Sequence, residues 1–161
     1  MSSFIQITDF KVGRFKLAIN PHNQGDLQSL IDKYEKDYII RLFGVTMGND
    51  IYSDPASKLE LTDPFQEEIN GNLVISEGVA EMLKGFIYFE YARINMVKSV
   101  VGGSAVANVE QGTNVNTTSY DIYTRFNEGV DTWKSIQYKC YNDSTLYPDF
   151  NGVELKYVMP I

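Results

Sequence analysis

Apolar residues recur every three or four positions in three stretches of the chain, the spacing of one face of an α-helix. The first stretch predicts a helix from about Asp26 to Phe43, the second from about Ser76 to Val101, and the third from about Thr118 to Asn142. The second stretch is so rich in large apolar residues that several neighbours must cover it. The residues of the three stripes are Leu27, Leu30, Ile31, Tyr34, Tyr38, Leu42, Val79, Leu83, Phe86, Ile87, Tyr91, Ile94, Val97, Tyr123, Phe126, Val130, Trp133, Ile136 and Cys140.

Glycines and capping residues predict where these helices begin and end. Gly44 is a C-terminal stop for the first helix, and Ser76 is the N-cap of the second. Gly102 and Gly103 end the second helix. Gly129 lies inside the third helix, where glycine costs about 1 kcal/mol relative to alanine. We therefore expect close packing against another helix at Gly129.

Residues 45–75 show no regular pattern, and we expect them to be irregular. The Asp54-Pro55 and Asp63-Pro64 pairs break regular elements. A short helical turn is expected over Pro64–Ile69, with Asp63 as its N-cap. Asn70-Gly71-Asn72 then predicts a turn, and Leu73–Ile75 a brief extended segment.

The two termini and one internal segment are predicted to lie outside the helices. Residues 1–22 alternate loosely between apolar and polar and predict an extended N-terminal arm. Residues 101–118 are small and polar and predict a long loop, and residues 147–161 predict a C-terminal arm. The fold class is therefore mainly α: a small helical bundle of about three main helices with extended N- and C-terminal arms and a long loop. It forms a single domain over residues 1–161.

Composition narrows the classes of function. The 161 residues carry a net charge of -7, which argues against a protein that binds nucleic acid by neutralising phosphates. The 11 tyrosines favour half-buried surfaces, where the ring packs and the hydroxyl reaches water or a partner. The N-terminal sequence does not resemble a signal peptide. A membrane-spanning helix needs about 20 mostly apolar residues, and no such stretch is present.

Residues that could carry catalysis or bind metal are few and widely spaced. His22 is the only histidine and Cys140 the only cysteine, so neither a zinc site nor a cysteine–histidine nucleophile is supported. Cys140 is expected to be a buried, inert thiol. Glu67 and Glu68 are adjacent, which favours a solvated acidic turn over an acid–base pair. We expect a protein that is not an enzyme, with no catalytic residue, no cofactor and no metal.

Five short segments carry a resemblance to a known family. They are, in chain order, LIDKYEKDYIIRLFG, GVAEMLKGFIYFEYAR, GGSAVANVEQG, YTRFNEGVDTW and YPDFNG. In this order they resemble the head–tail connector (neck or adaptor) proteins of tailed bacteriophages, of the type found in phages and prophages of Bacteroidetes. Three departures are present: Gln111 follows Glu110 where the family commonly has asparagine, Phe126-Asn127 stands where the family has Tyr-Asn, and the family's final Asn-x-x-Gly-Ile is replaced by residues 158–161.

The resemblance implies a structural virion protein that forms a homo-oligomeric ring, expected to be dodecameric. Such a ring joins the portal protein to the tail and continues the DNA channel. The implied partners are the portal protein, other neck or tail proteins, and DNA that passes through the lumen without specific binding; no membrane is involved. The implied location is the virion neck, and the host cytoplasm during assembly. The residues expected at the contacts between subunits are Phe4, Ile5, Gly102, Gly103, Val106, Val109, Tyr147, Phe150 and Tyr157.

Two other interpretations remain open at this point. The chain could be a different virion assembly protein, such as a tail-completion or stopper protein. It could also be a helical module that binds a small molecule in a pocket between the second and third helices, near Tyr91 and Trp133.

Overall fold

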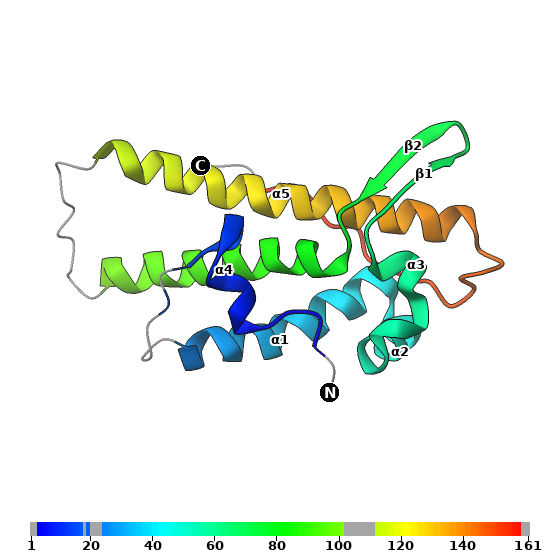
Figure 1. Cartoon of the computed structure of the whole chain (residues 1–161), viewed down its shortest axis with the longest axis horizontal. Coiled ribbons are helices and arrows are strands. Elements are labelled where there is room, and N and C mark those ends of the chain that lie inside the picture. Colours follow the sequence, from blue (N-terminus) through cyan, green and yellow to red (C-terminus); the bar gives the residue numbers. More distant parts are fainter. Residues whose placement is uncertain (1–2, 18, 20–23, 102–111, 159–161) are drawn as a thin grey trace.

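The computed structural model describes the backbone of residues 3–17, 19, 24–101 and 112–158, and the side chains of these residues apart from 95–119. The fold is mainly helical, with one two-stranded sheet, which confirms the predicted fold class. Figure 1 shows the arrangement of the elements. The elements are α1 (Gln24–Phe43), α2 (Val45–Ser53), α3 (Leu59–Thr62), β1 (Phe65–Ile69), β2 (Asn72–Ser76), α4 (Val79–Val101) and α5 (Gly112–Asn142).

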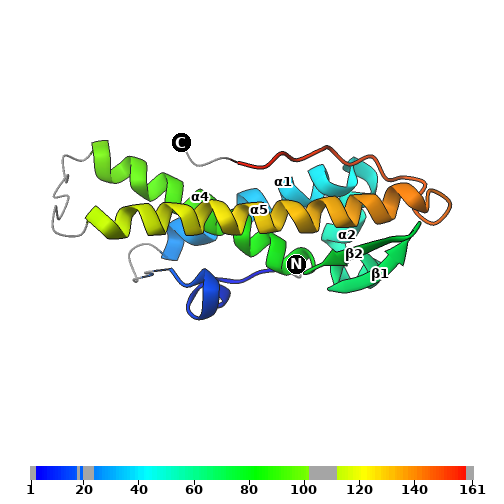
Figure 2. The same ribbon diagram turned by 90° about the horizontal axis from the view of Figure 1, so that it is seen from above.

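The two longest helices, α4 and α5, lie antiparallel and side by side (Figures 1 and 2). Two glycines allow their close approach. A Cβ at Gly85 would lie 2.7 Å from the carbonyl oxygen of Arg125, and a Cβ at Gly129 would lie 2.6 Å from the ring of Phe86. The close helix packing expected at Gly129 is therefore confirmed, and Gly85 supplies the second contact.

Aromatic side chains fill the space between these two helices and α1. The Phe86 ring lies 4.6 Å from that of Tyr38 and 4.9 Å from that of Phe126, centroid to centroid. Trp133 is fully buried beside Tyr38 and Phe86. The apolar stripes of the three predicted helices therefore meet around Phe86, at the centre of the core.

The segment expected to be irregular contains a second short helix. Gly44 ends α1 with φ of 91°, as predicted, but α2 begins at the next residue. Met47 and Ile51 form the buried face of α2. Gly48 fits tightly against α1, since a Cβ there would lie 2.7 Å from the Cα of Ile40. The pattern of α2 covers barely two turns, too few for its helical spacing to stand out in the sequence.

The helical turn expected over Pro64–Ile69 is wrong, because Phe65–Ile69 is strand β1. Asp63 is therefore not the N-cap of a helix. The turn predicted at Asn70-Gly71-Asn72 is confirmed: Asn70 and Gly71 have φ of 52° and 77°, the left-handed pair that favours a tight hairpin. β2 includes the extended segment predicted at Leu73–Ile75. The paired residues are Phe65 with Ser76, Gln66 with Ile75, Glu67 with Val74, Glu68 with Leu73, and Ile69 with Asn72.

The two long helices differ from prediction at their N-terminal ends. Ser76 ends β2 instead of capping α4; its hydroxyl accepts a hydrogen bond from the N–H of Gly78 at 3.1 Å, and α4 begins at Val79. α5 begins at Gly112 instead of near Thr118. The long loop predicted over residues 101–118 is wrong at both ends, and its central part, 102–111, lies outside the described residues.

The terminal segments pack on the helices. The described part of the predicted N-terminal arm is not extended throughout; it contains two 3-10 turns, Ile7–Phe10 and Gly13–Phe15, with the rings of Phe10 and Phe15 buried. Glu35 of α1 holds it by accepting hydrogen bonds from the hydroxyl of Ser3 and the N–H groups of residues 4 and 5. The C-terminal segment runs extended along α5 (Figure 2), and its described residues form no strand.

The close contact at Gly85 predicts that two glycine-to-alanine substitutions change the free energy of unfolding in opposite directions. Gly85→Ala should lower the free energy of unfolding by roughly 1–3 kcal/mol, because the new methyl group meets a backbone carbonyl that cannot move alone. Gly25→Ala, in the first turn of α1 with open space around it, should raise it by up to about 1 kcal/mol. Urea denaturation followed by tryptophan fluorescence measures both. Equal effects would contradict the assigned contact.

Candidate assembly surface

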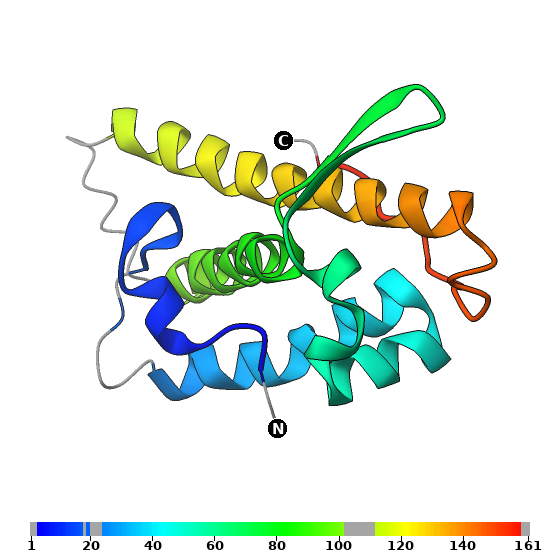
Figure 3. The same ribbon diagram turned by 45° about the vertical axis from the view of Figure 1, so that its right-hand side comes forward.

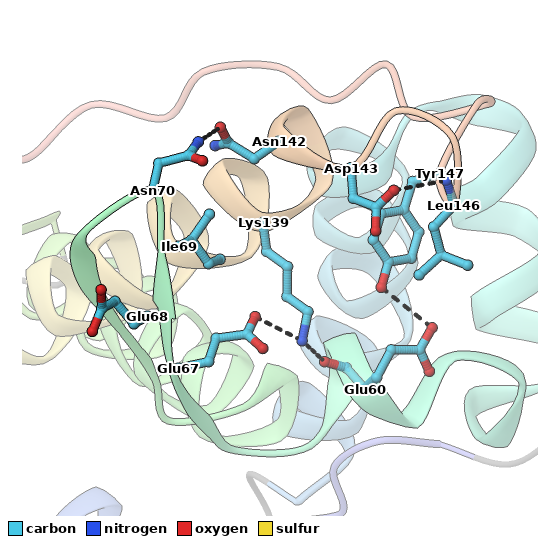
Figure 4. Close-up of a pocket in the computed structure, with 10 residues that line it drawn as sticks. All are labelled: Glu60, Glu67, Glu68, Ile69, Asn70, Lys139, Asn142, Asp143, Leu146 and Tyr147. Carbon is cyan, nitrogen blue, oxygen red and sulfur yellow. Dashed lines mark hydrogen bonds and ion pairs between the residues drawn. The ribbon is translucent and has the colours of Figure 1, made fainter.

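The β1–β2 hairpin is fixed to α5 by Lys139, as Figure 4 shows. The ammonium group of Lys139 lies 2.9 Å from Oε1 of Glu67 and donates a hydrogen bond of 3.0 Å to the carbonyl oxygen of Glu60. It also lies 4.3 Å from the centre of the Phe65 ring. The Lys139 side chain is only 15% exposed, so solvent screens this ion pair less than it screens one at an open surface. One lysine therefore joins β1, α3 and α5.

The tip of the hairpin is tied to the same helix by amide side chains. The amide of Asn70 donates a hydrogen bond to the side-chain oxygen of Asn142. The amide of Asn72 donates one of 3.2 Å to the hydroxyl of Tyr138. Together with Lys139, these contacts hold both the strands and the turn of the hairpin to α5, which the hairpin crosses in the view of Figure 3.

An open hollow of about 550 Å³ lies between the hairpin, the end of α5 and the turn that follows it (Figure 4). Carboxylates of Glu60, Glu67, Glu68 and Asp143 line it. Burial, followed by the charge of Glu60, raises the pKa of the Tyr147 hydroxyl, which stays protonated at neutral pH. No described group of three or more His, Cys, Asp or Glu side chains has the arrangement needed to hold a metal ion. Within the hollow, Lys139 is paired with Glu67 and Asn70 is bonded to Asn142, and these pairs make structural contacts.

The outward face of the hairpin presents two uncovered apolar side chains beside two polar ones. Leu73 is 63% exposed and Ile75 53% exposed. Their cross-strand partners on the same face, Glu68 and Gln66, are exposed as well. An exposed apolar sheet face of this kind is suited to packing against another protein.

The extended C-terminal segment is held by side chains of α5 that bond to its backbone. The side-chain amide of Asn127 both donates to the carbonyl of Val158 at 3.0 Å and accepts from its N–H at 2.9 Å. Trp133 and Gln137 each donate a hydrogen bond of 3.0 Å to the carbonyl of Val153. Because these bonds reach the backbone, the side chain of Val153 remains free to face outwards, and it is 53% exposed.

The sequence-predicted contact residues fall into three groups. Ile5 and Tyr147 lie in the core, 1% and 3% exposed, so they cannot contact a partner in this conformation. Phe4 and Phe150 are half-buried against the core. Tyr157 is exposed; its hydroxyl donates to Asp131, and the ammonium of Lys134 lies 3.6 Å from its ring centre.

The remaining predicted contact residues, Gly102, Gly103, Val106 and Val109, lie outside the described residues, as does His22. Sequence reasoning missed the hairpin face. The apolar run Leu73, Val74 and Ile75 after the Asn-Gly turn was its signal, since it marks a strand but does not reveal which side of the strand is covered.

Cys140 behaves as predicted. It is 1% exposed, and burial raises the pKa of its thiol to about 12. A thiol with this pKa holds almost no thiolate, the reactive form, at neutral pH.

Comparison with known proteins gives no assignment: no protein family, no curated protein and no solved structure matches the chain. The described helices include none with the length of apolar sequence that crossing a bilayer requires.

Replacing the Asn127 amide should release the end of the C-terminal segment. Asn127→Ala removes both hydrogen bonds to Val158, which we expect to cost about 1–2 kcal/mol locally. Hydrogen exchange of the Val158 amide should then accelerate by at least about tenfold. Asn49→Ala is the matched control, because that amide bonds only to the carbonyl of Val45 in its own helix. Unchanged protection in Asn127→Ala would contradict the role of the side chain.

The buried thiol predicts a latent reactivity. In the native protein at pH 8, a thiol reagent should modify Cys140 more than about 100-fold more slowly than a free cysteine. Labelling should become complete when urea unfolds the chain. Rapid stoichiometric labelling of the native protein would mean that Cys140 is accessible.

Proposed function

We propose that this chain is a structural subunit of a ring in the neck of a tailed phage, a head–tail connector between the portal and the tail. One observation carries the proposal: a hairpin fixed to the helical body exposes the apolar side chains of Leu73 and Ile75. A sheet face that is held in place and left uncovered is suited to packing against a neighbouring subunit.

The sequence resemblance supplies the particular assembly. Its YPDFNG segment has a clear structural role here, since Tyr147 is buried and Phe150 packs edge-on against Tyr141 at 4.9 Å. Gly152 fits directly against α1; a Cβ there would lie 1.9 Å from the carbonyl oxygen of Leu42. The segment therefore directs the C-terminal arm along α5 and determines which of its side chains face outwards.

The charge of the chain suits a channel component. A net charge of -7 repels DNA, so a ring of such subunits would let DNA slide through without holding it. A tail-completion or stopper protein would share these features, and position in the particle separates it from a connector.

The small-molecule module has less support than the assembly role. The site expected for it, between α4 and α5, is filled: Trp133 is fully buried against neighbouring rings, with 0% of its surface accessible. Its indole N–H is already bonded to the carbonyl of Val153. A ligand would have to displace core side chains to reach it.

The proposal predicts that the protein is a stoichiometric part of the particle. Quantitative mass spectrometry of purified phage encoding this chain should find it at a copy number equal to that of the portal protein, and imaging of the portal vertex should place it between portal and tail. Particles made without it should lack attached tails. Its absence from intact, infectious particles would remove the structural role.

A further inference from the structure

Opposite charges are concentrated in two separate segments of the chain. Residues 10–25 contain Lys11, Arg14 and Lys16 and no carboxylate. Residues 59–83 contain six carboxylates and neither lysine nor arginine. Arg14 of the first segment pairs with Glu77 of the second inside the molecule, so the charges that remain for a partner include Lys11 and Lys16 on one projection and Glu68 on the hairpin.

The basic projection is the turn Phe10–Lys16, called here the N-terminal tip. Val12 at its end is 72% exposed, the highest value among the described large apolar residues. Lys11 and Lys16 beside it are exposed, and within the described part of the chain neither forms a salt bridge. The tip thus presents one apolar side chain between two available ammonium groups.

The N-terminal tip is held firmly against the body. Phe15 is buried, and the guanidinium of Arg14 lies 2.7 Å from the carboxylate of Glu77 and 3.2 Å from that of Glu128. These contacts join the tip to the connection between β2 and α4 and to α5. Val12 therefore points outwards from a fixed turn, and little conformational freedom would be lost when a partner covers it.

The outer face of the hairpin has complementary chemistry. Leu73 and Ile75 form its apolar centre, and Glu68 lies directly opposite Leu73 in the strand register. Glu67, on the other face, is bonded to Lys139, whereas Glu68 forms no salt bridge with any described residue. An apolar side chain flanked by lysines matches an apolar patch that has a free carboxylate at its edge.

The two surfaces cannot meet within one molecule, because the tip and the hairpin are each fixed at their own place. Figure 2 shows both projecting from the same long side of the molecule, at different points along its length. A contact between two different surfaces of identical subunits is heterologous, and its repetition closes into a ring or continues as a filament.

We propose that the N-terminal tip of one subunit packs on the outer face of the hairpin of a second copy. Val12 lies against Leu73 and Ile75, and Lys11 or Lys16 pairs with Glu68. The inference rests on the ring-subunit role proposed above and names the contact that would build the ring.

A mixing experiment with two purified full-length variants tests this contact. Val12→Asp removes the tip surface and Leu73→Asp removes the hairpin surface, each at an exposed position. Sedimentation velocity up to millimolar concentration should show oligomers of the unmodified chain and monomers of each variant alone. A one-to-one mixture of the variants should give dimers and nothing larger, because each dimer joins the one intact tip to the one intact hairpin.

Val45→Asp is the matched control, since Val45 is 69% exposed and lies on α2, which is part of neither the tip nor the hairpin. It should self-associate like the unmodified chain. Circular dichroism and thermal melting should show all variants folded. An unmodified chain that stays monomeric at every concentration, or variants that do not form dimers when mixed, would overturn the contact.

Charge reversal gives an independent test. Glu68→Lys should weaken association at least tenfold, and pairing it with a Lys11→Glu, Lys16→Glu chain should restore it. Failure of this restoration would also overturn the contact. These outcomes are separate from those of the particle analysis: association through this contact by a protein that is absent from phage particles would remove the connector role and leave the contact standing.

Discussion

The close contact between α4 and α5 is the constraint on which the rest of the structure depends. Gly85 and Gly129 let the two helices approach until the ring of Phe86 covers Gly129. Only at that separation does Phe86 reach Tyr38 on α1 while remaining beside Trp133 on α5. A side chain at either glycine would push the helices apart and withdraw Phe86 from α1, because protein cores have little empty volume to absorb such a shift.

With its apolar face fixed in this way, α5 serves as the support for the remaining segments. Lys139 holds the hairpin, and Asn127 holds the end of the C-terminal segment. Gln137 donates hydrogen bonds both to the carbonyl of Leu42 at the end of α1 and to that of Val153. Hydrogen bonds from α5 side chains satisfy backbone polar groups of the extended C-terminal segment and leave its side chains free. The outward-facing chemistry is thereby separated from the chemistry that maintains the fold.

The sequence predicted the three main helices because their apolar stripes run for several turns, and it predicted a turn at Asn70-Gly71-Asn72, although not the hairpin that contains it. The prediction failed where the apolar pattern is short, and where the surrounding chain determines which secondary structure a residue adopts. Two turns of α2 are too few to reveal a period, and Pro64 after an aspartate resembles a helix start although a strand follows. Ser76 has the residue type of an N-cap but is needed in β2. The exposed face of the hairpin could not be predicted at all, since a short apolar run after a turn identifies a strand without showing which side the body covers.

Because the hairpin is already fixed to the helices, its small apolar surface can bind a partner more strongly than the same surface on a flexible hairpin. An isolated two-stranded hairpin is at best marginally stable in water. Here Lys139 and the two asparagines of the turn already order it during folding, so a partner that packs on Leu73 and Ile75 need not supply that ordering free energy. The same holds for Val12, whose turn is fixed by Phe15 and Arg14. Two rigid, complementary surfaces on one chain can therefore form a repeating contact whose strength comes mainly from apolar burial, with the opposite charges selecting its orientation.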